Sequence, residues 1–253
     1  MSNWLFPDRE EATDGPDGEA EAIDPADPAL DPEQTAIDPE AVDVGGLRPS
    51  RVEAGSSVLV AGPPMTGKRR LLFDLVGGSN ARTAAFVTSK KPAQKMAAWF
   101  AATRPDPDAW DLSFVDCTGS SGSERRSRTR DIVDLRIVSS PGDLTGVGIE
   151  LSGILRRWHG DSVDDARVGL HSLSTMLMYT ETKPLFQFLH AINTRIARVD
   201  AVGVYTLDMR PDAETATTLK QLFDSVVEVR SDDEGSEFRV RGGDFGPRSW
   251  TTF

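Results

Sequence analysis

The chain contains 253 residues, of which 38% are hydrophobic, and it carries a formal net charge of −12 at pH 7. Its single cysteine, Cys117, excludes an internal disulfide and a cysteine-based zinc site. The sequence has no run of about 18 apolar residues and no basic-then-apolar leader. We therefore expect a cytoplasmic protein without a membrane-spanning helix.

The negative charge is concentrated at the N-terminus. Residues 1–45 carry 14 Asp and Glu residues and one basic residue, Arg9, so residues 46–253 are close to neutral. Repeated Asp-Pro steps and few apolar side chains predict a disordered, acidic, proline-rich tail over residues 1–45. A solubilising arm and an interaction tail both remain open, the second because Trp4, Leu5 and Phe6 stand at its tip.

From residue 55 onward, strand-like apolar runs alternate with helix-like amphipathic segments. The patterns predict strands at 57–61, 84–88, 112–116, 135–139, 166–170 and 201–207, helices at 68–76, 92–102, 185–199 and 213–223, and a closing hairpin of 226–230 with 237–241. This alternation predicts a single α/β domain over residues 46–253, with a mainly parallel sheet flanked by helices and a small C-terminal hairpin.

One further helix is expected after the fourth strand. Ser140, Pro141 and Asp143 have the form of a helix start, with serine at the cap, proline in the first turn and an acid three residues after the serine. Apolar residues then recur at helical spacing as far as Trp158, which predicts one buried face.

Residues 62–69, GPPMTGKR, match the phosphate-binding pattern G-x-x-x-x-G-K-[ST] except at the last position, where Arg69 replaces the Ser or Thr that ligates Mg²⁺. Gly62 and Gly67 would let the backbone curl so that its N–H groups face an anion. Lys68 would reach the outer phosphates, and Thr66 would add a contact. A simple Gly/Pro turn carrying an exposed lysine is the competing interpretation.

At these residues the chain resembles the RecA/KaiC-type P-loop ATPases, particularly the short KaiC/GvpD-like proteins of halophilic archaea. The segments that carry the resemblance are VLVAGPPMTGKRR (58–70), VSSPGDLTGVGIELSGIL (138–155), RVGLHSLSTMLMY (167–179) and FQFLHAI (186–192). The resemblance implies a RecA-like P-loop NTPase fold over residues 46–253.

The chain departs from that family at three parts of its catalytic apparatus. The resemblance implies an Asp that holds Mg²⁺ where His171 stands, and acids that activate water where Lys90 and Lys91 stand. With Arg69, these departures predict degenerate catalysis. Binding of ATP or another nucleotide without a strong need for Mg²⁺ is expected, since the basic residues would replace the metal's charge. An exposed lysine loop and a structural histidine are the alternative readings.

The sequence favours a regulatory or scaffolding pseudo-ATPase that acts through a protein partner or self-association. An active ATPase in DNA repair or signalling, with Asp116 or Asp208 as recruited acids, remains open. So does an interaction domain with a vestigial loop.

A run of arginines lies in a Gly/Ser-rich stretch, at Arg125, Arg126, Arg128 and Arg130. Such a run is typical of a phosphate-backbone contact with nucleic acid, and equally of a solvated loop.

Overall fold

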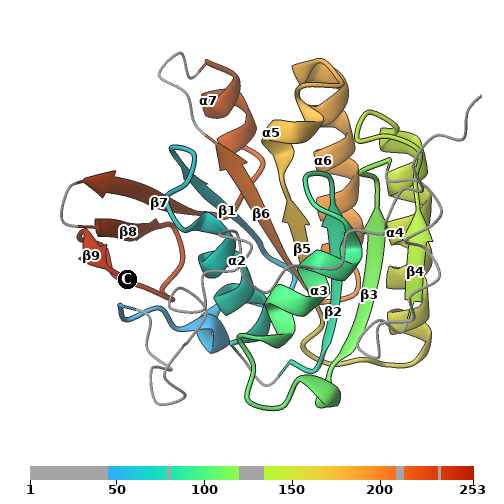
Figure 1. Cartoon of the computed structure of the whole chain (residues 1–253), viewed down its shortest axis with the longest axis horizontal. Coiled ribbons are helices and arrows are strands. Elements are labelled where there is room, and N and C mark those ends of the chain that lie inside the picture. The colour runs from blue at the N-terminus through green and yellow to red at the C-terminus, as the bar shows by residue number, and fades with distance from the viewer. Residues whose placement is uncertain (1–44, 79–80, 120–133, 209–213, 233–234) are drawn as a thin grey trace, which may run out of the picture. The chain divides into compact units, whose positions relative to one another are not determined.

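Figure 1 shows a computed structural model of the chain, which describes residues 45–78, 81–119, 134–208, 214–232 and 235–253. Two of the sequence predictions fall outside these residues. They are the acidic tail, except for Gly45, and the possible nucleic-acid contact formed by the arginines of residues 124–130.

The strands of the described residues form one nine-stranded sheet in the order β4-β3-β2-β5-β6-β1-β7-β8-β9. Pairing is parallel from β4 to β7, and β8 and β9 continue the sheet antiparallel. The fold is therefore α/β with a mostly parallel sheet and a C-terminal hairpin, as predicted. The strands are β1 (Ser57–Gly62), β2 (Thr83–Thr88), β3 (Asp111–Asp116), β4 (Asp134–Ile137), β5 (Arg167–His171), β6 (Val202–Asp208), β7 (Ser225–Asp232), β8 (Gly235–Arg241) and β9 (Thr251–Thr252).

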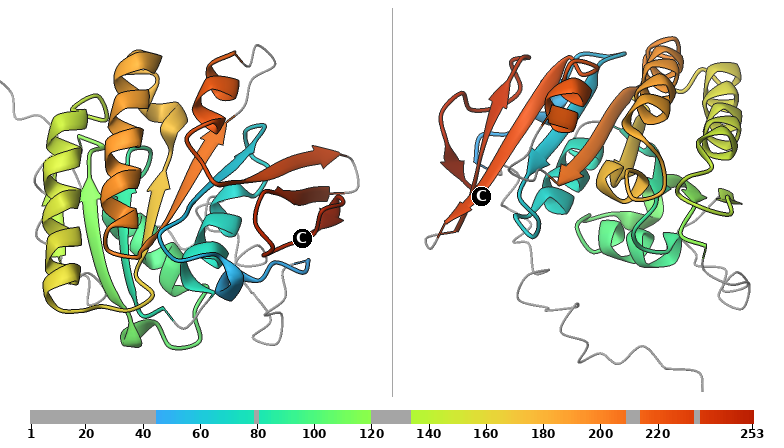
Figure 2. Two further views of the ribbon diagram at one scale, coloured as in Figure 1. Left: turned by 180° about the vertical axis from the view of Figure 1, so that it is seen from behind. Right: turned by 90° about the horizontal axis from the view of Figure 1, so that it is seen from above.

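Helices cover both faces of this sheet. α2 (Lys68–Gly77) and α3 (Ala93–Ala101) lie on one face, and α4 (Leu144–Gly160) and α6 (Thr182–Ala197) lie on the other (Figure 2). The shorter helices are α5 (Leu173–Met176), α7 (Glu214–Lys220), and the 3-10 turns η2 (Pro49–Arg51) and η3 (Pro107–Ala109). No helix among the described residues is both long and apolar enough to cross a membrane.

The central strands are buried on both faces, which explains their continuous apolar runs. Under α2 and α3, the rings of Phe73, Phe86 and Phe100 contact one another edge to face, with centroids 5.2 to 5.9 Å apart. On the opposite face, Leu151 and Ile154 of α4 are fully buried in an aliphatic core. The aromatic layer packs α2, and therefore the loop that precedes it, against the sheet.

Two helix starts differ from prediction. α4 is capped by Asp143, whose Oδ1 accepts a hydrogen bond from the Gly146 N–H at 2.8 Å, whereas the Ser140 hydroxyl accepts one from the Gly142 N–H at 3.1 Å. The predicted cap at Ser140 is wrong, because the aspartate is placed nearer the first free N–H groups. α6 begins a turn early, at Thr182, since Pro184 is tolerated in a first turn.

The parallel strands bring several chain segments to one edge of the sheet. In the strand register, Gly62 at the end of β1 lies beside Asp208 at the end of β6. Thr88 at the end of β2 lies beside His171 at the end of β5. The loop after β1, Lys90 after β2, His171 and Asp208 therefore meet at the carboxyl edge, where ligands of α/β sheets usually bind.

Candidate functional site

The loop Pro63–Gly67 connects β1 directly to α2. Its backbone takes left-handed conformations at Met65 (φ 63°) and at Gly67 (φ 76°), the residue before the first helical residue. Glycine avoids the steric cost of that conformation at Gly67. Gly62 is extended, as the last residue of β1, and a Cβ there would lie 2.3 Å from the Val229 carbonyl oxygen. The backbone turn that we predicted at Gly62 therefore lies at Met65. Gly62 has another role, because the absence of a side chain there allows β7 to pack close to β1.

Lys68, the first residue of α2, is folded into the loop and only 5% exposed. Its Nζ lies 2.9 Å from Asp208 Oδ1 and 3.4 Å from Thr66 Oγ1, and it donates a hydrogen bond to the Pro63 carbonyl. Burial lowers the pKa of Lys68, and the hydrogen bond and charge of Asp208 oppose that effect. The lysine charge is thus held at the carboxyl edge by one carboxylate.

Thr66 supports this arrangement from inside the loop. Its hydroxyl donates a hydrogen bond to the Pro63 carbonyl at 2.8 Å, and the side chain is buried. The Thr66 hydroxyl is therefore engaged by the loop itself, which braces the turn around Lys68.

The two lysines after β2 differ in their surroundings. Lys90 Nζ lies 3.9 Å from Asp208 Oδ2 and is half exposed, so Lys68 and Lys90 share one carboxylate. Lys91 forms no ion pair with any of the described residues. Of these two lysines, Lys90 is thus linked to Asp208 by an ion pair in the described structure.

His171, at the end of β5, faces the same group of charges. Burial, followed by the positive charges of Lys90 and Arg69, lowers the pKa of His171 to about 4. Its Nδ1 lies 2.8 Å from Thr206 Oγ1, whose hydroxyl donates to the Leu170 carbonyl at 3.4 Å. This pattern assigns the proton of the neutral ring to Nδ1 and leaves Nε2 as an acceptor.

The backbone after His171 is tied to the end of β2. The peptide bond between His171 and Ser172 is cis. The Ser89 hydroxyl donates to the Ser172 carbonyl and accepts from the Ser172 N–H, both at 2.9 Å. One buried serine therefore fixes the position of His171 relative to the loop that carries Lys90.

Arg69 lies at the margin of the site. Its guanidinium stacks 3.8 Å above the ring of Trp99 on α3, and burial lowers its pKa. Its charge still acts on His171, so the guanidinium is close enough to contribute to the local field.

Mg²⁺ prefers oxygen ligands in octahedral geometry. Two oxygen-bearing side chains at the loop are already engaged by protein groups: the Thr66 hydroxyl bonds inside the loop, and Asp208 pairs with Lys68 and Lys90. Arg69 and His171 stand where the resemblance to P-loop ATPases implies oxygen ligands, and neither side chain carries an oxygen.

The two carboxylates that sequence reasoning considered as recruited acids are both engaged. Asp116 Oδ2 accepts from the Ala93 N–H at 2.8 Å, and its Oδ1 accepts from the Thr118 N–H at 2.9 Å, so Asp116 holds the start of α3. Asp208 is held by Lys68 and Lys90. Both carboxylates therefore have protein partners in this structure.

Sequence reasoning missed two features of the site. It treated Asp208 only as an alternative acid, although an aspartate that ends a strand beside β1 must lie near the loop. It also missed Trp99, whose contact with Arg69 depends on how α3 packs against α2 and has no local sequence signal.

Comparison with known proteins places the chain in a family. Residues 55–229 match a model described as "Family of unknown function (DUF7504)". The chain belongs to this family. The DUF7504 region includes the Pro63–Gly67 loop, Lys90, His171 and Asp208, whereas β8 and β9 lie outside it. No curated protein matches the chain.

Among solved structures, a protein from Pyrococcus horikoshii OT3 (Project ID PH0250) is similar to this DUF7504 member, with a TM-score of 0.53. The match covers 80% of this chain and 94% of that chain, at 11% sequence identity. At this identity the likeness shows the fold alone.

Proposed function

We propose that this chain is a RecA/KaiC-like protein that binds ATP or another polyphosphate without a divalent metal and hydrolyses it little or not at all. It would act as a nucleotide-responsive regulatory or scaffolding module. The observation that carries the proposal is the sharing of Asp208 by Lys68 and Lys90 beside the loop.

The surroundings of the loop support the assignment to this P-loop class. The pattern G-x-x-x-x-G-K is meaningful only between a strand and a helix, and here β1 precedes it and α2 follows it. β1 is flanked on both sides by parallel strands, which places the loop within the carboxyl edge of the sheet. The helix N-terminus adds a partial positive charge at the same place.

The charges around the loop support binding without a metal. Lys68, Lys90 and Arg69 bring three positive charges, and Asp208 brings one negative charge. The sum is close to the charge of the Mg²⁺ ion that usually accompanies a nucleotide. A polyphosphate would take over the role of Asp208 as the partner of the buried Lys68.

The same residues argue against efficient hydrolysis. Hydrolysis of this type depends on Mg²⁺ and on a positioned water molecule. Loss of one group that stabilises the transition state costs roughly 10²–10³ in rate, and loss of the activating base costs roughly 10²–10⁴ more. Lys90 and His171 stand where these groups are expected from the resemblance, and Asp116 and Asp208 are engaged elsewhere.

Two assays on the same full-length protein test this function. Differential scanning fluorimetry with ATP at about 100 times its Kd should raise the melting temperature by about 5–10 °C. Phosphate release from MgATP should stay at background. Lys68→Ala should lose the thermal shift, whereas Lys183→Ala, an exposed lysine on α6, should keep it.

The outcomes separate the alternatives. MgATP turnover that Lys68→Ala abolishes would identify an active ATPase and refute the proposal. Absence of both a thermal shift and turnover would leave the loop without a nucleotide-binding role.

A further inference from the structure

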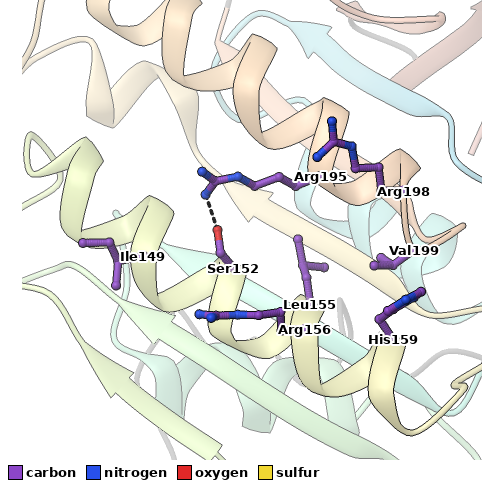
Figure 3. A pocket seen from close by; sticks show the side chains of 8 residues that line it. All are labelled: Ile149, Ser152, Leu155, Arg156, His159, Arg195, Arg198 and Val199. Carbon is purple, nitrogen blue, oxygen red and sulfur yellow. Dashed lines mark hydrogen bonds between the residues drawn. The ribbon is translucent and has the colours of Figure 1, made fainter.

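A groove runs between α4 and α6, on the face of the sheet opposite α2 and α3 (Figures 2 and 3). Its volume is about 700 Å³. Leu155, 3% exposed, and the partly buried Val199 lie at the floor between the two helices, and Ile149 stands at the rim, 61% exposed. An apolar floor in a concave setting, with an exposed apolar side chain at its rim, is typical of a docking site.

The polar lining of the groove carries only positive or neutral side chains. Arg156 comes from α4, Arg195 from α6 and Arg198 from the end of α6, and none of the described residues that line the groove is an Asp or a Glu. Arg195 reaches across to α4, where it donates hydrogen bonds to the Ser152 hydroxyl and to the Gly148 carbonyl (Figure 3). None of the described residues forms an ion pair with Arg156 or Arg198. Two exposed arginines beside apolar surface therefore remain without a counter-charge.

The basic stretch has a defined end. His159, Arg198 and Val199 also line a second cavity of about 530 Å³. Its lining includes Asp164 and Asp200, and Asp165 in an ion pair with Arg167 at 2.7 Å. Asp164 and Asp200 make this second cavity less favourable than the groove for an acidic ligand. The charges therefore favour an acidic ligand, and they favour its binding in the groove rather than in the second cavity.

We propose that this groove binds an acidic, amphipathic helix of a partner protein. The apolar ridge of that helix would cover Ile149, Leu155 and Val199, and its flanking carboxylates would pair with the arginines. A third helix fits the furrow between two neighbouring helices through ridges and grooves, and such partners present anchors at i, i+3, i+4 and i+7. The stretch from Ile149 to His159 is about 15 Å long, which corresponds to about three turns of the partner.

Other occupants fit less well. The floor of the groove is apolar, which a nucleic-acid backbone would not cover. The apolar side chains lie in a concave furrow between helices, whereas a flat lipid surface needs them to project outward. The inference does not depend on the proposed nucleotide site, because the groove and α2 lie on opposite faces of the sheet.

The test is a binding titration with a defined probe. A fluorescein-labelled helical peptide of about 16 residues, with Leu at i, i+3, i+4 and i+7 and Glu on both flanks, is titrated with the full chain by fluorescence anisotropy. A matched peptide has Lys in place of every Glu. We expect the acidic peptide to bind at least about tenfold more tightly than the basic one, with a difference that shrinks as salt is added.

Variants of the protein locate the site. The double variant Arg156→Glu/Arg198→Glu should bind the acidic peptide about tenfold more weakly or worse, because two attractions become repulsions. Arg48→Glu/Arg248→Glu, which reverses two exposed arginines that do not line the groove, is the matched control and should bind normally. Hydrogen exchange should show new protection in residues 149–159 and 192–199 when the acidic peptide is added.

Three results would overturn the inference. Equal binding by the double charge-reversal variant or by the basic peptide would exclude charge recognition in this groove. Stronger competition by a synthetic peptide of residues 1–24 than by the unlabelled acidic helix would identify a segment of this chain as the occupant. Equal protection of the groove by anionic phosphatidylserine vesicles would identify a lipid surface.

Discussion

Replacing Asp208 with Asn tests the idea that this carboxylate occupies the position of a bound anion. Asp208 lies 2.9 Å from Lys68 Nζ and 3.9 Å from Lys90 Nζ. A phosphate oxygen at hydrogen-bond distance on the other side of Nζ would lie about 6 Å from the carboxylate. Asn keeps the shape of the side chain and removes its negative charge.

The size of the effect follows from Coulomb's law. Two unit charges about 6 Å apart repel each other by about 3 kcal/mol at an effective dielectric constant of about 20. Solvent reaches part of the Asp208 side chain, which is 23% exposed, so about half of this energy should remain. Removal of the carboxylate should then tighten anion binding by about 1–2 kcal/mol, or roughly tenfold.

The assay is isothermal titration calorimetry with sodium tripolyphosphate and EDTA. We expect Asp208→Asn to bind tripolyphosphate about tenfold more tightly than the unaltered chain. The variant should also be less stable without ligand, because it leaves the buried Lys68 charge without an ionic partner. The substitution removes a group that supports the pKa of Lys68, so the measurement is made near pH 6.5, where the protonated form is more favoured than at higher pH. Unchanged or weaker binding would refute the reasoning.

Three stability measurements test other parts of the structure. The pKa of His171 is lowered from 6.5 to about 4 in the folded chain, so the unfolded state takes up the proton first as the pH falls. The free energy of unfolding should therefore drop by about 2–3 kcal/mol as the pH falls through this window. In urea titrations His171→Gln should lose less stability over the same pH range, and parallel stability curves for the two proteins would contradict this. Burial raises the pKa of Asp74 from 3.8 to about 6, so the ionised carboxylate destabilises the fold at pH 7. Asp74→Asn should therefore be more stable than the unaltered chain at pH 7, by about 1–3 kcal/mol, and this advantage should vanish near pH 4. A gain in stability that does not depend on pH would exclude titration of Asp74 as its cause. Gly62→Ala should cost at least about 1–3 kcal/mol because its Cβ would overlap the Val229 carbonyl, whereas Gly160→Ala, in open space, should be neutral or stabilising; equal melting temperatures would contradict the contact.

The alternation of patterns was sufficient to predict the fold class, because buried parallel strands read as continuous apolar runs and their covering helices as amphipathic segments. Helix starts were less predictable. Ser140 and Asp143 are both good caps, and only the three-dimensional position of Asp143 decides between them. The short helix α5 and strand β9 have too few residues for a periodic signal.

The candidate site was predictable where sequence position determines spatial position. Lys90 and His171 follow neighbouring parallel strands, so their meeting near Lys68 follows from topology. Contacts set by side-chain packing were not predictable. Arg69 stacks on Trp99 of α3, and this contact depends on how α3 packs beside α2. The Thr66 hydroxyl bonds to the Pro63 carbonyl, and this contact depends on the shape of the turn. The arrangement of Lys91 likewise depends on the loop conformation after Ser89.

The most direct test of the central claim is the metal dependence of nucleotide binding. Fluorescent ATP analogue is titrated with the full chain once in EDTA and once in excess Mg²⁺, at matched ionic strength. With Lys68, Lys90 and Arg69 supplying the positive charge, the two Kd values should agree within about twofold. Binding that appears only when Mg²⁺ is present would contradict the claim that these side chains replace the metal.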